Sequence, residues 1–369
     1  MSRDPGLASW LQLSLTPGLG PATLRKLLQQ FGLPQAVLAR KRSELSLLAP
    51  PAALAALDSE PVANAVARAL AWAAEPGHAV ITLADETYPR LLLEIADPPP
   101  LLYARGRVEL LQRSAIAIVG SRNATQQGAA NAEAFARTLS EAGLTIVSGL
   151  ALGIDAAAHR GGLQGAGSTV AVLGTGIDII YPQRNAALAA EIAVRGLIVS
   201  EFPLGSAPSA QNFPRRNRLI SGLARGCLVV EAAVASGSLI TARAAADQGR
   251  DVFAVPGSIH SPLAKGCHVL IKSGAKLVES AEDVLSELSG FRPSGFASTR
   301  EPSRAANEQA AGGLLAHMGH DPVDVDSLCS RAGLSAEQVS SELLRLELDG
   351  RVAALPGGLY QRLEKEGRR

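Results

Sequence analysis

The sequence has few of the features that mark secreted, membrane-spanning or disulfide-stabilised proteins. Its three cysteines, Cys227, Cys267 and Cys329, are scattered and form no Cys-x-x-Cys pair, which fits a reducing compartment and excludes a disulfide scaffold. No apolar run is long enough to cross a bilayer, and the opening residues MSRDPGLASW lack the apolar core of a signal peptide. We therefore expect a cytoplasmic protein without a membrane segment.

An excess of charge of one sign is also missing. The chain carries 35 Lys and Arg against 34 Asp and Glu, a formal net charge of +1. This balance argues against a wholly basic, histone-like binder, so a polyanionic partner would have to be held by a focused patch of charge. The six histidines form no carboxylate–histidine signature, and we expect no metal site and no other cofactor.

What the chain does have is length and apolar content. With 369 residues, 47% of them hydrophobic, it is too long for one ordinary core, and two or three domains are expected. Composition and pattern then give the expected bounds: short helices in 1–75, an α/β core in 76–290, a linker rich in Ser, Pro and Arg in 291–310, and a compact helical unit in 311–369.

The α/β core is predicted from short apolar runs that alternate with helical stretches, such as AIAIVG, LTIVSG and TVAVLG. Apolar residues that run on without alternation indicate strands buried on both faces, and hence a parallel sheet covered by helices. Several of these strands lead directly into glycine. In an open α/β sheet, that carboxyl edge is where ligands bind.

Near the N-terminus, the segment LTPGLGPATLRKLLQQFG places Gly18 and Gly20 before a helix. The apolar residues of that helix share one face: Leu24, Leu27 and Leu28. This pattern resembles a helix-hairpin-helix element, in which exposed amides at the helix start hold a phosphate. A plain helical turn explains it equally well.

The C-terminal unit reads as a short helix, a turn, a second helix with a capping box at Ser335, and a hairpin turned at PGG. This order is typical of a winged helix. Its recognition helix, however, carries Glu337, Glu342 and Glu347 against Arg345. Such a charge pattern matches a phosphate backbone poorly, so a protein contact or a structural role stays open beside DNA binding.

Glycine loops follow four of the core strands. In IVGSRNATQQG, Gly120 permits a tight turn, Ser121 offers a hydroxyl and Arg122 offers a fork for a phosphate. The spacing is neither GxGxxG nor a P-loop. The other three loops, SGLALGIDAAAH, LGTGIDIIYPQRN and ASGSLITA, contribute Ser148, Gly149, Gly174, Ser236, Gly237 and Ser238.

The four loops should converge on one edge of the sheet. A rim of amides, hydroxyls and arginines suits successive phosphates better than one small ligand. Asp155 falls in the first turn of a helix, where we expect a structural cap, and His159 follows one turn later as a packed histidine. Neither residue belongs to a Ser–His–Asp set.

The segment FPRRNRLISGLARG concentrates positive charge, since no acidic residue occurs between Glu201 and Glu231. Phe213 offers a flat face to a base, and the nearby arginines offer charge to a nucleic-acid backbone: Arg215, Arg216, Arg218 and Arg225. Aromatic and arginine side chains together are typical of a platform for single strands. The alternative is that Phe213 is buried and the arginines pair with acids elsewhere on the fold.

Taken in order, several long motifs resemble the DprA (Smf) family of DNA-processing proteins over residues 80–290. They are IVGSR, SGLALGIDAAAH, PQRN, EFPLG, FPRRNRLISGLA, VVEAAVASGSLITA, GRDVFAVPG and GCHVLIKSGA. The resemblance implies an extended Rossmann-like parallel sheet as core, with a helix-hairpin-helix or SAM-like helical domain before it and a winged helix after it.

The same resemblance implies a non-enzymatic protein that binds single-stranded DNA largely independently of sequence. It also implies a homodimer formed through the core and loading of RecA in natural transformation or recombination. The DNA-contact motifs of the family fall here on Gly120, Ser121, Arg122, Phe213, Arg215, Arg216, Asn217, Arg218, Ser236, Gly237 and Ser238. The family often has Asn where this chain has His268, and a phosphate contact there would make binding pH-sensitive.

A second hypothesis is an enzyme that binds or hydrolyses nucleotides. Rossmann-like phosphoribohydrolases resemble this core but carry a PGGxGTxxE loop, where this chain reads ASGSLITA without the two-glycine turn or the glutamate. A third hypothesis is a nucleotide-sensing module, which needs one compact pocket. The long arginine track argues against it, because such a track suits an extended ligand. The sequence leaves the partners of both terminal units open.

Overall fold

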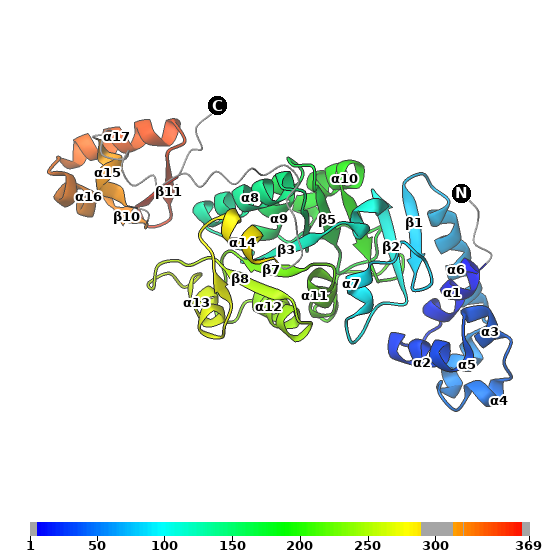
Figure 1. The fold of residues 1–369 in the computed structure, drawn as a ribbon. Coiled ribbons are helices and arrows are strands. Elements are labelled where there is room, and N and C mark those ends of the chain that lie inside the picture. Colours follow the sequence, from blue (N-terminus) through cyan, green and yellow to red (C-terminus); the bar gives the residue numbers. More distant parts are fainter. Residues whose placement is uncertain (1–5, 289–312, 320, 364–369) are drawn as a thin grey trace. The chain divides into compact units, whose positions relative to one another are not determined.

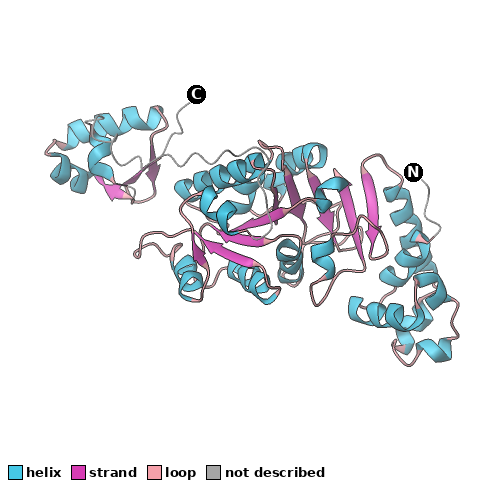
Figure 2. Ribbon diagram, in the orientation of Figure 1, coloured by secondary structure: helices cyan, strands magenta, loops and turns pink. Residues whose placement is uncertain are grey.

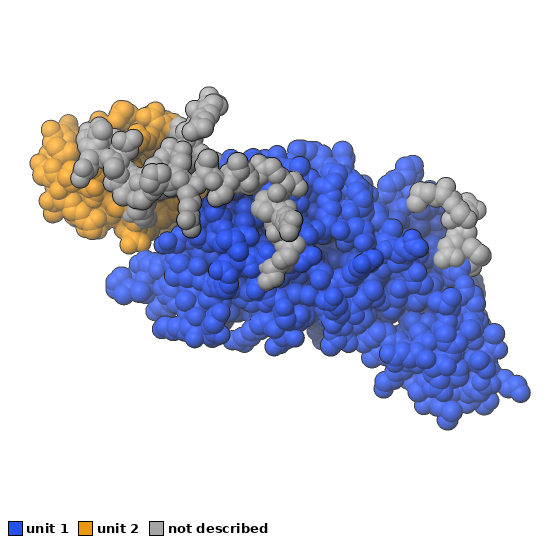
Figure 3. Space-filling view, viewed as in Figure 1, with its two compact units in different colours: residues 1–123, 131–294 blue, residues 124–130, 295–369 orange. Residues whose placement is uncertain are grey.

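The computed structural model describes residues 6–288, 313–319 and 321–363, and the linker expected at 291–310 lies outside these residues. The chain divides into two compact units, residues 1–123 with 131–294 and residues 124–130 with 295–369 (Figure 3). Within the described residues, no helix is both long enough and apolar enough to span a bilayer.

The first unit is built on a nine-stranded sheet with the order β1-β2-β6-β5-β4-β3-β7-β8-β9 (Figure 1). Its strands are β1 (His78–Thr82), β2 (Leu101–Gly106), β3 (Ala115–Val119), β4 (Thr145–Ser148), β5 (Thr169–Val172), β6 (Leu197–Ser200), β7 (Gly226–Val229), β8 (Asp251–Ala254) and β9 (Lys276–Leu277). All neighbours from β6 to β9 pair in parallel, and β1 and β2 extend the sheet in antiparallel register. The expected α/β fold class with a parallel core is confirmed.

The direction of chain travel across this sheet reverses beside β3. From β3 the chain moves outward through β4, β5 and β6, and β7 then returns to the other side of β3, where Ile116 pairs with Gly226. The connections that leave β3 and β7 therefore cover opposite faces of the sheet. A crevice opens at their carboxyl ends, which is the usual ligand position in open α/β sheets.

Helices cover both faces of the sheet (Figure 2), so that every residue of its central strands is buried. They are α7 (Arg90–Leu93), α8 (Gln126–Glu141), α9 (Ile154–Gly162), α10 (Ala186–Arg195), α11 (Asn212–Gly222), α12 (Gly237–Asp247), α13 (Lys265–Lys272) and α14 (Ala281–Glu287), with 3-10 turns η1 (Val108–Gln112) and η2 (Gln183–Asn185). Leu219 of α11 and Leu239 of α12 pack in one core with β3 and β7, whereas Ile192 of α10 belongs to another.

Six helices precede the sheet: α1 (Leu7–Leu15), α2 (Pro21–Phe31), α3 (Pro34–Leu38), α4 (Arg42–Leu45), α5 (Pro51–Ala56) and α6 (Glu60–Ala73). Leu24 and Leu27 of α2 are buried in the core of this bundle, with Leu28 packed against it, as the sequence predicted. Leu11 of α1 packs instead with Tyr103 of β2. The helical element therefore rests directly on the β1–β2 edge, and the boundary expected at 75/76 stays a prediction.

The second unit has the winged-helix layout that the sequence predicted. It contains α15 (Leu314–Met318), β10 (Val323–Asp324), α16 (Val325–Ala332), α17 (Ala336–Leu348), β11 (Val352–Leu355) and β12 (Leu359–Arg362), with the strand order β10-β12-β11. The capping box forms: Ser335 Oγ accepts from the Gln338 amide at 3.3 Å, and Gln338 Oε1 accepts from the Ser335 amide at 3.0 Å.

Adjacent leucines on α17 allow a test of this packing. Leu343 is fully buried, whereas the side chain of Leu344 is 59% exposed. We expect Leu343→Ala to destabilise the winged helix by about 2–5 kcal/mol, because it leaves a cavity. Leu344→Ala should change stability by less than about 0.5 kcal/mol. Hydrogen exchange of the α17 amides measures both, and equal effects would contradict the packing.

Candidate nucleic-acid interface

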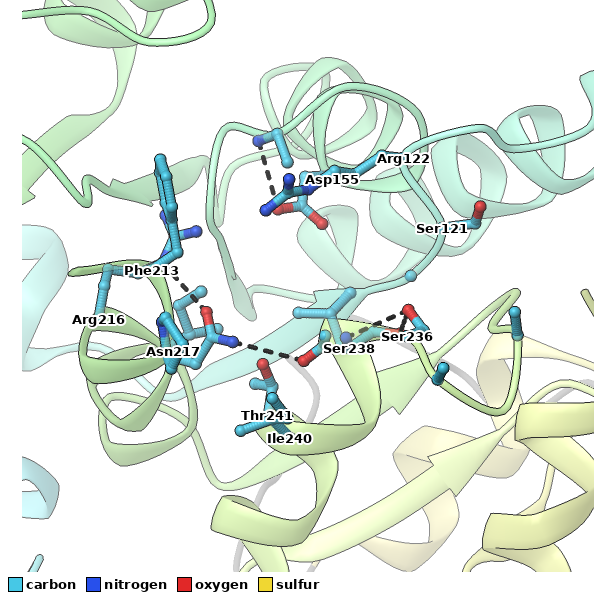
Figure 4. Close-up of a pocket in the computed structure, with 18 of the residues that line it drawn as sticks. Ser121, Arg122, Asp155, Phe213, Arg216, Asn217, Ser236, Ser238, Ile240 and Thr241 are labelled. Carbon is cyan, nitrogen blue, oxygen red and sulfur yellow. Dashed lines mark hydrogen bonds between the residues drawn. The ribbon is translucent and has the colours of Figure 1, made fainter. Parts of the chain in front are cut away.

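A pocket of about 590 Å³ lies at the crevice between β3 and β7 (Figure 4). Its walls come from the loop after β3, the start of α9, the first turns of α11 and the loop that leads into α12. The expected residues that line it are Gly120, Ser121, Arg122, Phe213, Arg216, Asn217, Ser236, Gly237 and Ser238. The other six lie outside the lining: Ser148, Gly149, Gly174, Arg215, Arg218 and His268.

The loop after β3 is fixed by backbone contacts to the strand beside it. The Ser121 amide donates to the Glu231 carbonyl at 2.7 Å, and Ser121 Oγ accepts from the Asn123 amide at 3.1 Å. Gly120 lets this loop approach α9, because a Cβ there would lie 2.6 Å from Cγ1 of Ile154. The turn therefore holds the next side chain, Arg122, at the mouth of the pocket.

Arg122 is exposed, and its guanidinium carbon lies 5.6 Å from the centre of the Phe213 ring. Such a cation–π contact orients the guanidinium while leaving its N–H donors free to bind other groups. Among the residues that the structure describes, no carboxylate lies within ion-pair distance of Arg122. The pocket thus opens beside an arginine whose charge is available to an anion.

Phe213 stands in the first turn of α11 and is partly buried. Gly174 makes room for it, because a Cβ at this position would lie 2.7 Å from Cδ1 of the ring. Tyr181, which is 46% exposed, lies next to it with ring centres 5.7 Å apart and planes tilted by 37°. Sequence reasoning missed Tyr181, although it is the aromatic residue of the loop that follows Gly174.

Arg216 points inward, away from solvent, and is only 4% exposed. Its Nη1 donates to the carbonyl of Gly149 at 2.6 Å and also to the carbonyl of Val172. A Cβ at Gly149 would lie 2.7 Å from this guanidinium, so the glycine leaves space for the arginine. Burial lowers the pKa of Arg216 to about 10, with Asp155 acting in the opposite direction.

The neighbouring arginines of α11 face in other directions. Arg215 is exposed and lies over the ring of Phe202, 5.5 Å from its centre. Arg218 forms ion pairs with Glu201 and with Asp97. The alternative in which arginines of this segment pair with remote acids therefore holds for Arg218, whereas Arg215 keeps its charge toward solvent.

Asp155 supports the loop in front of α9. It is buried and accepts hydrogen bonds from the amides of Gly149 at 3.1 Å and Ala151 at 3.3 Å. Burial raises the pKa of Asp155, while Arg216 and the two amides act to lower it. Ser148, also buried, donates to the Ile118 carbonyl at 2.7 Å. Ser148 and Asp155 thus fix the backbone of these loops through their hydrogen bonds.

The start of α12 forms the wall opposite Arg122. Ser236 is the N-cap, and its Oγ accepts from the Ser238 amide at 3.3 Å. Asn217 of α11 reaches across and donates from Nδ2 to the Gly237 carbonyl at 3.4 Å. Because free amides and the helix dipole favour negative charge at such a position, an anion in the pocket would meet positive potential from two sides.

The remaining chemistry of the pocket is sparse. Of the described residues that line it, only Arg122, Asp155 and Arg216 ionise, and the Asp155 carboxylate is already bound by amides. His268 lies on α13 with Nε2 3.0 Å from the Gly257 carbonyl. No cluster of three His, Cys, Asp or Glu able to hold a metal occurs among the described residues. The arrangement is suited to binding an anion and a flat ring together.

Comparisons with known proteins match both units. The model of a family described as DNA recombination-mediator protein A matches residues 79–289, and that of a DprA winged helix domain matches residues 298–358. Protein Smf of Escherichia coli is 44% identical over 308 residues, which cover 82% of each chain. DNA processing protein DprA of Streptococcus pneumoniae is 50% identical over 206 residues, which cover 56% of this chain and 73% of that one.

Solved structures agree with these matches. The X-ray structure of DprA from Streptococcus pneumoniae superposes with a TM-score of 0.68 and 38% identity, over 79% of this chain and 100% of the other. The structure of DNA processing protein A from Helicobacter pylori, described by its single-stranded DNA binding mode, gives a TM-score of 0.51 and 30% identity. That match covers 56% of this chain and 93% of the other.

His159, one turn after Asp155 on α9, gives a pH dependence that can be measured. It is fully buried, its Nδ1 lies 2.7 Å from Thr169 Oγ1, and its Nε2 accepts from the Leu150 amide at 3.3 Å. Burial lowers the pKa of His159 to about 3. Since the unfolded chain takes up this proton near pH 6.5 and the folded chain does not, stability falls as pH decreases from about 6.5 toward 3.

The expected slope from His159 is up to about 1.4 kcal/mol per pH unit within that window. Denaturant unfolding between pH 8 and pH 5 should therefore show a shallower loss of stability in His159→Gln than in wild type. Asp155, whose pKa is raised, is present in both proteins and cancels in the comparison. Parallel pH profiles would contradict a neutral, buried His159.

Proposed function

The chain belongs to the DNA recombination-mediator protein A family, also called DprA or Smf, and on that premise we propose that it binds single-stranded DNA in the pocket between β3 and β7. Binding is largely independent of sequence and involves no chemical step. The bound strand is then passed to RecA during natural transformation or recombination, and the protein acts as a homodimer formed through its core.

One observation carries the DNA site: a half-buried aromatic ring lies at the mouth of one pocket beside Arg122, which has no ion-pair partner in the described part of the chain. The ring of Phe213 packs against Gly174 and lies next to Arg122 and Tyr181. A base that stacks on these rings would place its phosphate beside the Arg122 guanidinium and the start of α12. Every base has a flat face, so such a site tolerates any sequence.

The core is a better place for DNA than the winged helix. Residues 313–363 contain seven Asp and Glu, four Arg and no Lys. The exposed surface of α17 presents Leu344 and Leu348 together with Glu347. Because affinity for nucleic acid comes mainly from neutralised phosphates, this surface contributes little of it.

A nucleotide hydrolase is the second candidate, and the pocket gives it little support. Its carboxylate, Asp155, is buried and bound by two amides beside Arg216. A general base must reach the proton that it removes. Incubation with AMP or CMP followed by chromatography of free bases would detect hydrolysis, which the binding proposal does not expect.

The stacking role of Phe213 predicts a loss of affinity that does not depend on charge. Phe213→Ala should weaken binding of oligo-dT by about 5- to 150-fold, since stacking contributes roughly 1–3 kcal/mol per base. Gly174→Ala should weaken it as well, because its Cβ would displace the ring. Gly313→Ala, whose Cβ would meet nothing within 4 Å, serves as control. Fluorescence anisotropy measures all three, and wild-type affinity for Phe213→Ala would contradict the site.

Arg122 should instead change the response to salt. If Arg122 neutralises one phosphate, Arg122→Ala lowers the slope of log K against log salt by about 0.7. Arg105→Ala removes an exposed arginine near Gly106, where β2 meets the opposite end of β6, and should leave the slope unchanged. Equal slopes for wild type and Arg122→Ala would exclude a phosphate contact at this arginine.

A further inference from the structure

A chain of charged side chains connects the N-terminal helices to α11. Arg25 of α2 forms an ion pair with Asp97, and its Nη1 donates to the Pro98 carbonyl at 3.0 Å. The other oxygen of Asp97 lies 3.3 Å from Nε of Arg218. Arg218 Nη2 in turn donates to Glu201 Oε2 at 2.5 Å. Three segments far apart in sequence are thus joined by consecutive ion pairs.

Burial increases along the part of this chain that runs from Asp97 through Arg218 to Glu201. The side chain of Asp97 is 45% exposed, those of Arg25 and Arg218 are 19% and 16% exposed, and that of Glu201 is 3% exposed. Burial raises the pKa of Glu201, while Arg218 acts to lower it. A buried carboxylate without its partner is costly, so Arg218 is firmly held at the end of β6.

The segment that contains Asp97, and so links Arg25 to Arg218, is stiff. Residues 97–100 read Asp-Pro-Pro-Pro, and each proline ring fixes a backbone φ angle. The Tyr88 hydroxyl donates to the Pro99 carbonyl at 2.8 Å, and the Leu83 amide donates to the Pro100 carbonyl at 3.1 Å. A displacement at α2 would therefore be transmitted to Asp97 with little loss.

Arg218 and Phe213 stand on the same helix, α11. The carbonyl of Arg218 also accepts a hydrogen bond from Gln248 Nε2 at 3.1 Å. The position of the ring at one end of α11 thus depends on how Arg218 is held further along the helix. Binding sites lose affinity when such supporting contacts are loosened, even by about 1 Å.

We propose that Arg25 and Asp97 are positioning residues, which hold α11 and its Phe213 in the orientation that binds single-stranded DNA. The N-terminal helices then set the affinity of the core without touching the strand. This inference rests on the proposed function of the pocket. It assigns a role to the proline-rich segment 97–100, which does not line the pocket.

Asp97→Asn gives the decisive test, because two explanations predict opposite signs. If Asp97 acted only through its charge, removing a negative charge would strengthen binding of oligo-dT. If it positions α11, the change weakens binding by about 3- to 30-fold, the usual range for coupling through packed networks. Arg218 itself is unsuitable for substitution, since its loss leaves Glu201 buried and unpaired.

Arg25→Met and Lys26→Met form a matched pair on α2. Each removes one positive charge, but Lys26 is exposed and takes no part in the ion-pair chain. We expect Arg25→Met to weaken oligo-dT binding with an unchanged salt slope, and Lys26→Met to leave binding as in wild type. The double variant Arg25→Met/Asp97→Asn should bind no more weakly than Asp97→Asn alone. If Arg25→Met and Lys26→Met weakened binding equally, and each lowered the slope of log K against log salt by about 0.7, α2 would contact DNA directly and the proposal would be overturned.

Hydrogen exchange of the free full-length protein provides a readout that needs no DNA. In Asp97→Asn, the amides of α11 should exchange faster than in wild type, and in Lys26→Met they should not. Unchanged exchange in Asp97→Asn, or unchanged oligo-dT affinity, overturns the positioning role. If wild type itself fails to bind oligo-dT, the proposed function is wrong, and the α11 exchange rates alone decide whether Asp97 holds the helix.

Discussion

The pocket depends on one buried guanidinium, that of Arg216. It binds the carbonyls that follow β4 and end β5, lies beside the buried Asp155, and donates from Nε to Asn217 Oδ1 at 3.2 Å. Asn217 then reaches the start of α12. Two strands and two helices thus converge on one side chain, and the charges of the buried Arg216 and Asp155 each favour the ionised form of the other. The exposed Arg122 and the partly buried Phe213 are held in place by this buried network.

Much of this architecture could be predicted from sequence. Uninterrupted apolar runs gave the strands of the parallel core, because strands covered on both faces need no polar alternation. Glycine at the strand ends indicated the edge at which the loops after β3 and β7 meet. The capping box at Ser335 and the turn before β12 indicated the winged helix. In each case a local pattern was sufficient, because it reported burial or a backbone turn.

The directions of the α11 side chains could not be predicted in this way. Arg215, Arg216 and Arg218 look equivalent in the sequence, but successive helical residues are rotated by about 100°. One arginine therefore faces solvent, one is buried and one meets Glu201. Their partners come from segments remote in sequence. Gly149 and Gly174, which the sequence predicts as DNA-binding positions, leave space for Arg216 and Phe213.

The reversal of strand order at β3 also has a consequence for how the protein is made. One wall of the pocket follows β3, but the opposite wall forms only when β7 pairs with it, as in the contact of Ile116 with Gly226. Pairing over such a sequence distance is slow, because the entropy of closing a long loop is lost before any stabilising contact forms. During synthesis, a nascent chain that already displays Arg122 therefore still lacks the other half of the pocket. The pocket is therefore incomplete until the chain has been made as far as β7 and that strand has paired with β3.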